Sequence, residues 1–294
     1  MFLWDNTGET RIRFDTVDTA DEGGARGAPA IECAGASLAA WLDACTVPIV
    51  VHDHARAGIL GTATLLRVGQ RHLLLTAAHL FDGATSSGNW LVPERATGQL
   101  LSLEGAQVRI VKGSDIALID LTRTPARLRL LHARAAIPAP LALRARFAAH
   151  RHKLHGSSLR GTASHGFAPH GFAPHGTTPH RITYCLAGYP AAWSRFERGY
   201  LAAKRLTITT TQATHQRHDK TGDLRCLYGR TAERSDGQVI HTPALEGMSG
   251  AAIWEVERVN GSAALHLAGV QSAFMHSRYL RGDAADACEP FSRR

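Results

Sequence analysis

The sequence has 294 residues, of which 44% are hydrophobic and 20% are charged, and its formal net charge is +8. This length allows one large domain or two small ones, and the composition excludes a wholly disordered chain, a collagen and a coiled coil. No apolar run reaches the roughly 18 residues of a membrane span, and the first residues lack the basic flank and apolar stretch of a secretion signal. We therefore expect a cytoplasmic protein without a membrane partner.

The first part of the chain predicts one helix followed by a set of short strands. Residues 1–46 are expected to be an N-terminal extension with a helix near residues 36–44. Residues 47–122 contain β-forming runs separated by turn signals, and Gly69-Gln70 is predicted as a tight turn. The runs are 49–51, 58–68, 71–76, 90–93, 100–103, 107–112 and 116–121. Their spacing is typical of an antiparallel barrel or sandwich.

Residues 123–181 interrupt this pattern with a stretch rich in Arg, Ala, Pro and His. A pentapeptide, His-Gly-Phe-Ala-Pro, begins at His165, repeats at His170 and returns as His-Gly-Thr-Thr-Pro at His175. Gly and Pro in every unit prevent a continuous helix or a central strand. We therefore expect a flexible linker or surface loop.

The positive charge and many of the histidines gather near the same stretch. No Asp or Glu occurs between Leu121 and Phe196, where eleven residues are Lys or Arg, and seven histidines lie between residues 150 and 180. A basic stretch can bind nucleic acid, and a His-rich tract can bind Zn²⁺, Ni²⁺ or Cu²⁺ weakly and unselectively. We favour a solvated connector, and we expect no cofactor, no built metal site and no nucleic-acid partner.

A second set of β-forming runs follows the linker. These runs are 181–187, 200–211, 224–228, 251–256 and 265–272. Residues 182–281 are therefore expected to form a second barrel, and residues 282–294 a tail. The predicted fold class is all-β, with two antiparallel barrels joined by a low-complexity Arg/His-rich insertion.

The cysteines indicate free thiols. Five are present, an odd number, and none forms the Cys-x-x-Cys pair of a zinc site. With no secretion signal, we expect all of them to be reduced. They are Cys33, Cys45, Cys185, Cys226 and Cys288.

Three short strings carry residues suited to nucleophilic chemistry. His79 follows an apolar run that ends in Thr-Ala-Ala, Asp115 opens the apolar run 116–121, and Ser249 lies in Gly-Met-Ser-Gly. A serine hydroxyl becomes a good nucleophile when an imidazole takes its proton, and a carboxylate fixes the imidazole tautomer. Asp82 and Asp120 are alternative carboxylates, and Asp115 is preferred because it opens the strand.

The glycine beside the serine fits the same chemistry. A tetrahedral intermediate carries negative charge that backbone N–H groups can stabilise. Gly247 lets the chain turn so that the amides of Gly247 and Ser249 point the same way.

Together these strings resemble the chymotrypsin/trypsin-like serine proteases. The resemblance rests on Gly61-Thr62-Ala63, Thr76-Ala77-Ala78-His79, Asp115-Ile116-Ala117-Leu118, Gly247-Met248-Ser249-Gly250, Ala187-Gly188-Tyr189-Pro190 and Ala268-Gly269-Val270-Gln271-Ser272, and it covers about residues 47–122 and 182–280. It implies two antiparallel six-stranded β-barrels with the active site between them. It also implies His79 as general base, Asp115 as its orienting partner, Ser249 as nucleophile, and Gly247 and Ser249 as oxyanion hole.

Two departures from the family bear on regulation. Leu80 stands where secreted animal members have a disulfide cysteine, and Met248 stands where zymogen-type members have an Asp. We therefore expect no activation by cleavage of the N-terminus. Regulation would require a protein partner or the N-terminal extension.

The resemblance also implies how substrate binds. Ser272 to Phe274 would pair with an extended peptide, and Gln271 and Phe274 would line or narrow the specificity pocket. Pro243 stands six residues before Ser249, where an Asp would select basic side chains. We therefore expect a small or apolar residue before the cleaved bond.

The sequence as a whole predicts a serine endopeptidase that acts on a protein or peptide substrate through an acyl-enzyme. The alternatives are a catalytically silent binding module on a protease fold, and a protein that binds metal or nucleic acid through residues 123–181.

Overall fold

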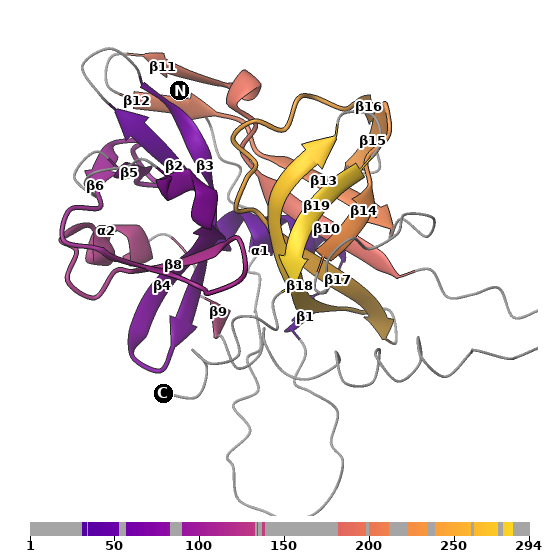
Figure 1. The fold of residues 1–294 in the computed structure, drawn as a ribbon, viewed down its shortest axis with the longest axis horizontal. Helices are drawn as coiled ribbons and strands as arrows, with labels where there is room; N and C mark the ends of the chain where they lie inside the picture. Colours follow the sequence, from indigo (N-terminus) through magenta and orange to yellow (C-terminus); the bar gives the residue numbers. More distant parts are fainter. Residues whose placement is uncertain are drawn as a thin grey trace, which may run out of the picture.

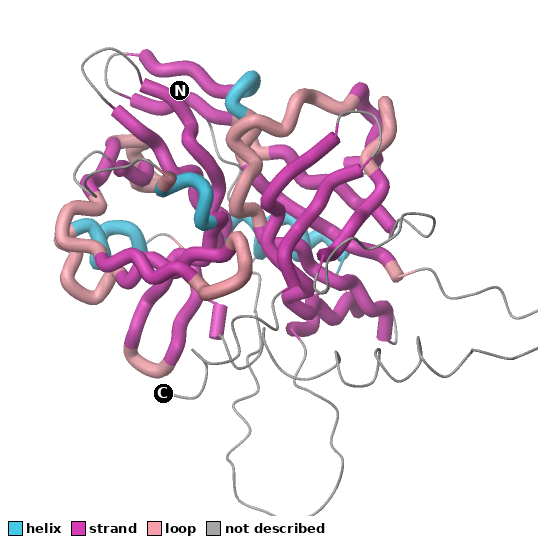
Figure 2. The backbone as a smooth tube through the Cα atoms, in the orientation of Figure 1, coloured by secondary structure: helices cyan, strands magenta, loops and turns pink. Residues whose placement is uncertain are grey.

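A computed structural model shows a mostly β chain with few, short helices (Figure 2). Two curled half-barrel antiparallel sheets lie next to each other, one built from the first half of the chain and one from the second (Figure 1). The structure describes residues 31–33, 35–52, 57–82, 90–132, 134, 137–138, 182–197, 200–211, 223–234, 239–259, 262–275 and 279–284. The prediction that the chain is mostly β is confirmed.

The first sheet has eight strands in the described residues, in the order β6-β5-β2-β3-β4-β8-β7, and β9 pairs with β3. The strands are β2 Thr46–His52, β3 Ala57–Val68, β4 Arg71–Ala77, β5 Trp90–Pro93, β6 Leu100–Ser102, β7 Gln107–Ile110, β8 Ile116–Asp120 and β9 Ile137–Pro138. The predicted turn at Gly69-Gln70 joins β3 to β4, with Gly69 at φ 58°.

The second sheet has nine strands in the described residues, in the order β14-β19-β18-β17-β10-β13-β15-β16, and β1 pairs with β18. The strands are β1 Ile31–Cys33, β10 Thr183–Gly188, β13 Leu206–Thr211, β14 Asp223–Leu227, β15 Thr231–Arg234, β16 Val239–His241, β17 Ala252–Val259, β18 Ser262–Met275 and β19 Tyr279–Ala284. Both sheets therefore hold more strands than the six that we expected for each barrel.

The strands nearest the centre are apolar on both faces because both faces are covered. In β4, Leu74 points into the core of the first sheet, whereas Leu73 and Leu75 point into a core shared by both sheets. The shared core also takes Leu267 and Val270 from β18. A third cluster fills the concave side of the second sheet. Alternating side chains thus build one core inside each sheet and one between the sheets.

The expected helix near residues 36–44 is α1 Gly35–Cys45, and it belongs to the shared core. Trp41 is 2% exposed and packs edge-on against Trp254 of β17, with ring centroids 5.1 Å apart. Figure 1 shows α1 between the two sheets. This part of the expected N-terminal extension therefore contributes to the packing of the sheets.

The expected linker begins with ordered structure. Helix α2, Ala126–His132, buries Ala126 and Leu130 in the core of the first sheet, and Leu128 faces outward. The sequence analysis did not predict this helix, because it is short and lies in an arginine-rich stretch that was interpreted as a linker. The pentapeptide repeats and the seven histidines lie outside the described residues.

The predicted run 200–211 is two strands in different sheets. Strand β12, Tyr200–Ala203, pairs with β11, Ser194–Glu197, in a separate hairpin that follows the short helix η3, Ala191–Trp193. Lys204 and Arg205 lie between the two strands, and the guanidinium of Arg205 pairs with Asp43 of α1 at 2.6 Å. Strand β13 then returns to the second sheet.

Candidate active site

His79 and Asp115 are brought together at the end of two paired strands. Strands β4 and β8 pair as far as Ala77 and Ile116, so the next residue on each side falls at the same point. His79 lies in the short helix η1, Ala78–Phe81, which follows β4 directly. Its Nδ1 lies 2.6 Å from Oδ2 of Asp115, and its backbone N–H donates to Oδ1 at 2.8 Å.

These contacts fix the imidazole in one orientation. Asp115 uses both carboxylate oxygens on the same histidine, and its backbone carbonyl accepts from the N–H of Ala78 at 3.2 Å. With Nδ1 facing the carboxylate, the neutral ring carries its proton there and leaves Nε2 as an acceptor. The geometry suits a general base.

The electrostatics of the pair favour a protonated imidazole. The hydrogen bond to Asp115 raises the pKa of His79 above its ordinary value of 6.5, and burial opposes this. The charges of Asp115 and Asp82 raise the pKa further, and the charge of Arg281 lowers it. The result is a base that holds a proton more tightly than a free imidazole.

The other two carboxylates that we considered occupy different places. Asp120 accepts hydrogen bonds from the backbone N–H and hydroxyl of Thr122, at the far end of β8. Asp82 acts on His79 through its charge. Of the three, Asp115 is the carboxylate that hydrogen-bonds to the ring and the backbone of His79.

Ser249 lies in a turn that only glycines can form. Gly247 and Gly250 have φ angles of +87° and +93°, in the left-handed region that side chains disfavour. A Cβ on Gly250 would lie 2.1 Å from the carbonyl oxygen of Thr62 and 2.1 Å from Oγ1 of Thr76. The backbone of the turn is therefore pressed directly against β3 and β4.

This close approach brings the serine to the histidine end of β4. The same added Cβ on Gly250 would lie 2.9 Å from the backbone N of Ala77, which precedes His79 by two residues. The N–H of Thr62 also donates to the carbonyl of Ser249 at 2.8 Å. The turn belongs to the second half of the chain, so the site is assembled from both sheets.

The hydrogen bonds of the turn leave two amides available. The N–H groups of Met248, Gly250 and Ala251 donate to backbone carbonyls at 2.7–2.9 Å. Within the described residues, no backbone carbonyl accepts from the N–H of Gly247 or Ser249. Those two amides are the pair that we expected for an oxyanion hole.

Two threonines that sequence analysis missed support this turn. Thr62 donates its hydroxyl to the carbonyl of Gly247 at 2.8 Å and accepts from the N–H of Tyr189 at 3.1 Å. Thr76 donates to the carbonyl of Thr62 at 2.7 Å. Both threonines are completely buried next to apolar residues of their strands, and hydroxyls in such places need hydrogen-bond partners, which is the signal that could have identified them.

The residues expected to bind substrate lie around the turn. Gln271 is completely buried, and its backbone accepts from the N–H of Gly250 and donates to the carbonyl of Ala251. Its side-chain Nε2 donates to the carbonyl of Ala273 at 3.1 Å. Gln271 thus anchors the turn as well as flanking it.

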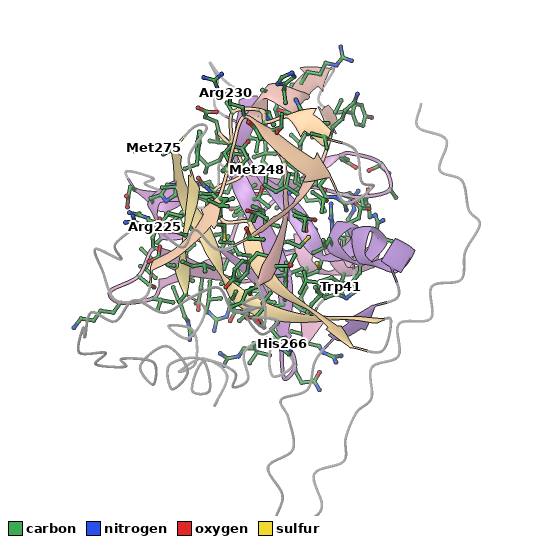
Figure 3. The ribbon with its side chains drawn as sticks, turned by 90° about the vertical axis from the view of Figure 1, so that its right-hand side faces the viewer. Trp41, Arg225, Arg230, Met248, His266 and Met275 are labelled. Carbon is green, nitrogen blue, oxygen red and sulfur yellow. The ribbon has the colours of Figure 1, made fainter. Side chains whose placement is uncertain are left out.

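The remaining three differ in burial. Ser272 is 6% exposed, Phe274 is half-buried against the core of the second sheet, and Pro243 is half-buried. The hydroxyl of Tyr228 donates a hydrogen bond to the carbonyl of Pro243. This position therefore carries a neutral hydrogen bond. Figure 3 labels Met248, the buried residue between Gly247 and Ser249.

Two searches for other kinds of site gave negative results in the described part of the chain. No group of three or more His, Cys, Asp and Glu side chains there is arranged to hold a metal ion. No helix among those residues has the length and apolar character needed to cross a bilayer.

Comparison with known proteins adds little to this geometry. No protein-family model and no curated protein matches the chain. One similar solved structure is described as "Aromatic interactions drive the coupled folding and binding of the intrinsically disordered Sesbania mosaic virus VPg protein". It is 12% identical with a TM-score of 0.42, over 85% of this chain and 92% of that chain. At that TM-score, we base no argument on the likeness.

Proposed function

We propose that the protein is a serine endopeptidase with the two-barrel, chymotrypsin-like architecture, and that His79, Asp115 and Ser249 form its catalytic triad. The observation that carries the proposal is the junction at the end of β4. There the His79–Asp115 pair, at 2.6 Å, meets a glycine turn seated against Thr62, Thr76 and Ala77. One half of the chain supplies the base and its partner, and the other supplies the nucleophile.

The first half of the reaction forms an acyl-enzyme. Nε2 of His79 takes the proton from the hydroxyl of Ser249 as its oxygen attacks the carbonyl carbon of the peptide bond. Asp115 stabilises the resulting imidazolium, and the amides of Gly247 and Ser249 donate to the oxyanion. His79 then gives its proton to the leaving nitrogen as the C–N bond breaks, leaving the acyl group on Ser249.

The second half restores the serine. A water molecule gives a proton to Nε2 of His79 and attacks the ester carbonyl through the same oxyanion arrangement. Collapse of the second intermediate returns the proton to the oxygen of Ser249 and releases the carboxylic acid. The proposed chemistry consumes water and no cofactor, and it uses the three side chains together with the amides of Gly247 and Ser249.

The substrate is proposed to bind as an added strand. Pairing between β17 and β18 ends at Ala252 and Val270, whereas β18 continues to Met275 and pairs there with β19 on its other side. Within the described residues, the β17-side edge of 272–275 has no strand partner. An extended peptide would pair with this edge, which begins one residue after Gln271, the residue of β18 that anchors the Ser249 turn.

Hydrolysis of a casein-derived peptide mixture by the purified full chain tests this proposal. Mass spectrometry should detect new peptide termini with the wild type and none above background with Ser249→Ala. The matched control is Ser102→Ala, because Ser102 lies in β6 and its hydroxyl oxygen accepts a hydrogen bond from the nearby N–H of Glu104. Equal cleavage by wild type and Ser249→Ala would contradict the proposal.

A further inference from the structure

Arg281 is a cation whose side chain reaches β18, the strand proposed to receive the substrate on its other edge. It lies in β19 opposite Ala273 of β18, and its Nε donates to the hydroxyl oxygen of Ser272 at 3.4 Å. The neighbouring Leu280 is completely buried in the core of the second sheet. Because side chains alternate along a strand, Arg281 points to the opposite face, away from that core.

The guanidinium of Arg281 is close enough to His79 for its charge to lower the pKa of the imidazole. Arg281 therefore contacts Ser272 of the second sheet and acts by its charge on the base carried by the first sheet. A peptide bound at the strand edge with its cleaved bond at Ser249 would pass this guanidinium.

Within the described residues, the guanidinium of Arg281 makes one hydrogen bond, to Ser272, and no ion pair. Asp115, the carboxylate paired with His79, has both oxygens engaged by that histidine. Arginine carries five N–H donors, so four remain for another acceptor. Arg281 is half-buried, which exposes part of the side chain to solvent while removing some of its hydration.

We infer that Arg281 is a specificity-determining residue that binds an acidic side chain of the substrate close to the cleaved bond. The inference rests on the proposed function and names its substrate class: peptides with Asp or Glu near the cleavage site. A carboxylate matches the planar fork of a guanidinium and can accept two parallel hydrogen bonds from it. The sequence analysis predicted a small or apolar residue before the cleaved bond, from Pro243, Gln271 and Phe274.

The position of the acidic residue is set by the alternation of an extended peptide. Side chains of the bound strand point alternately toward and away from the face that carries Arg281. Only every second substrate position can reach the guanidinium. The preference should therefore appear at one position, or at positions two residues apart, and be absent from the position between them.

Cleavage of peptides by the full chain tests the inference. A library with one Glu moved through the four positions on each side of the cleaved bond identifies the preferred position. Matched peptides with Glu or Gln there, and with Asp or Asn, then give the acid-to-amide ratio of kcat/KM. For the wild type we expect a ratio of about 10 to 100, the range for a hydrogen bond to a charged group.

Substitutions of Arg281 should change this ratio specifically. Arg281→Gln should bring it to about 1, and Arg281→Lys should keep a preference for acid at a reduced level, because lysine retains the charge without the fork. The control is Arg230→Gln, which alters an exposed arginine of the turn before β15 and should keep the wild-type ratio; Figure 3 labels Arg230. Circular dichroism checks that each variant is folded.

The outcomes separate the inference from the proposed function. Wild-type cleavage with equal rates for acid and amide peptides would overturn the role of Arg281 and leave the protease proposal standing. A ratio that survives in Arg281→Gln would do the same. If Arg281→Gln does not fold, the acid-to-amide ratios of the wild type and of Arg281→Lys still test the role of Arg281. Absence of both hydrolysis and covalent labelling of Ser249 would overturn the protease proposal and this inference together.

Discussion

The two halves of the molecule hold their parts of the site in different ways. The first sheet positions His79 and Asp115 through side-chain hydrogen bonds of 2.6 and 2.8 Å. The second half positions Ser249 through backbone geometry: positive φ angles at two glycines and carbonyls and amides bonded to neighbouring strands. The position of His79 should therefore depend on the chemistry of the Asp115 side chain. The position of Ser249 should depend on the absence of a Cβ at the two glycines.

The largest expected effect comes from changing the chemistry of the first arrangement. Asp115→Asn keeps the shape of the side chain but removes the charge that fixes the imidazole tautomer. We expect kcat to fall about 10⁴-fold with little change in fold. Steady-state kinetics with an active-site titrant measure it, and near-wild-type turnover would assign the acid role to another carboxylate, such as Asp82.

A smaller but still large effect should follow from adding one methyl group to the second arrangement. In Gly250→Ala the new Cβ would lie 2.1 Å from the carbonyl oxygen of Thr62, and φ would stay near +93°. We expect a loss of about 3 kcal/mol in the free energy of unfolding, from overpacking and backbone strain. Urea unfolding followed by fluorescence measures it.

Gly58→Ala is the matched control for Gly250→Ala. Gly58 lies in β3 of the first sheet, and nothing lies within 4 Å of a Cβ added to it. Its stability should stay within about 1 kcal/mol of the wild type. If both variants are equally stable, the turn is not pressed against the first sheet as described.

The pH dependence of activity should depend on the His79–Asp115 pair, the arrangement built by the first sheet. Asp115 raises the pKa of His79 above 6.5, and only the neutral imidazole can act as base, so kcat/KM should fall on the acid side with an inflection above pH 6.5. In Asp115→Asn the inflection should move to lower pH. For stability the sign is the opposite: the pair favours the folded state at low pH and loses that contribution as pH rises through the raised pKa.

The smallest expected effect concerns the thiols, which belong to neither arrangement. Burial raises the pKa of Cys45, Cys185 and Cys226 to about 12, so little reactive thiolate forms at pH 8. These three should react with a thiol reagent only after unfolding, as counted by intact-mass spectrometry. Rapid modification of all five cysteines in the native protein would contradict this packing.

The parts of the molecule that sequence analysis anticipated are those encoded locally. The run before His79 and the run after Asp115 are apolar on both faces, so their strand character and their ends could be located. The tight turn at Ser249 could be located as well, because glycine on both sides of the serine is a local signal. The split of 200–211 into two strands could not be anticipated, because β12 pairs with β11 in a separate hairpin whereas β13 pairs within the second sheet.

The sequence analysis assigned no role to Thr62, Thr76 or Arg281, because their roles depend on long-range contacts. Thr62 and Thr76 look like ordinary β-forming residues until the turn of Ser249 packs against them. Arg281 is one arginine in a charged C-terminal stretch, and its position depends on the register between β18 and β19. Long-range contacts of this kind leave no periodic signal in the sequence.

Covalent labelling with a fluorophosphonate tests the central claim most directly, because the probe reacts with a serine activated by a nearby base. The full chain should gain the mass of one phosphonyl group, which is the probe less HF because fluoride leaves as the serine oxygen bonds to phosphorus, and peptide mapping should locate it at Ser249. Ser249→Ala should remain unlabelled, and Ser102→Ala should label as the wild type does. A folded wild-type protein that takes up no probe, or takes it up elsewhere than Ser249, would contradict the account.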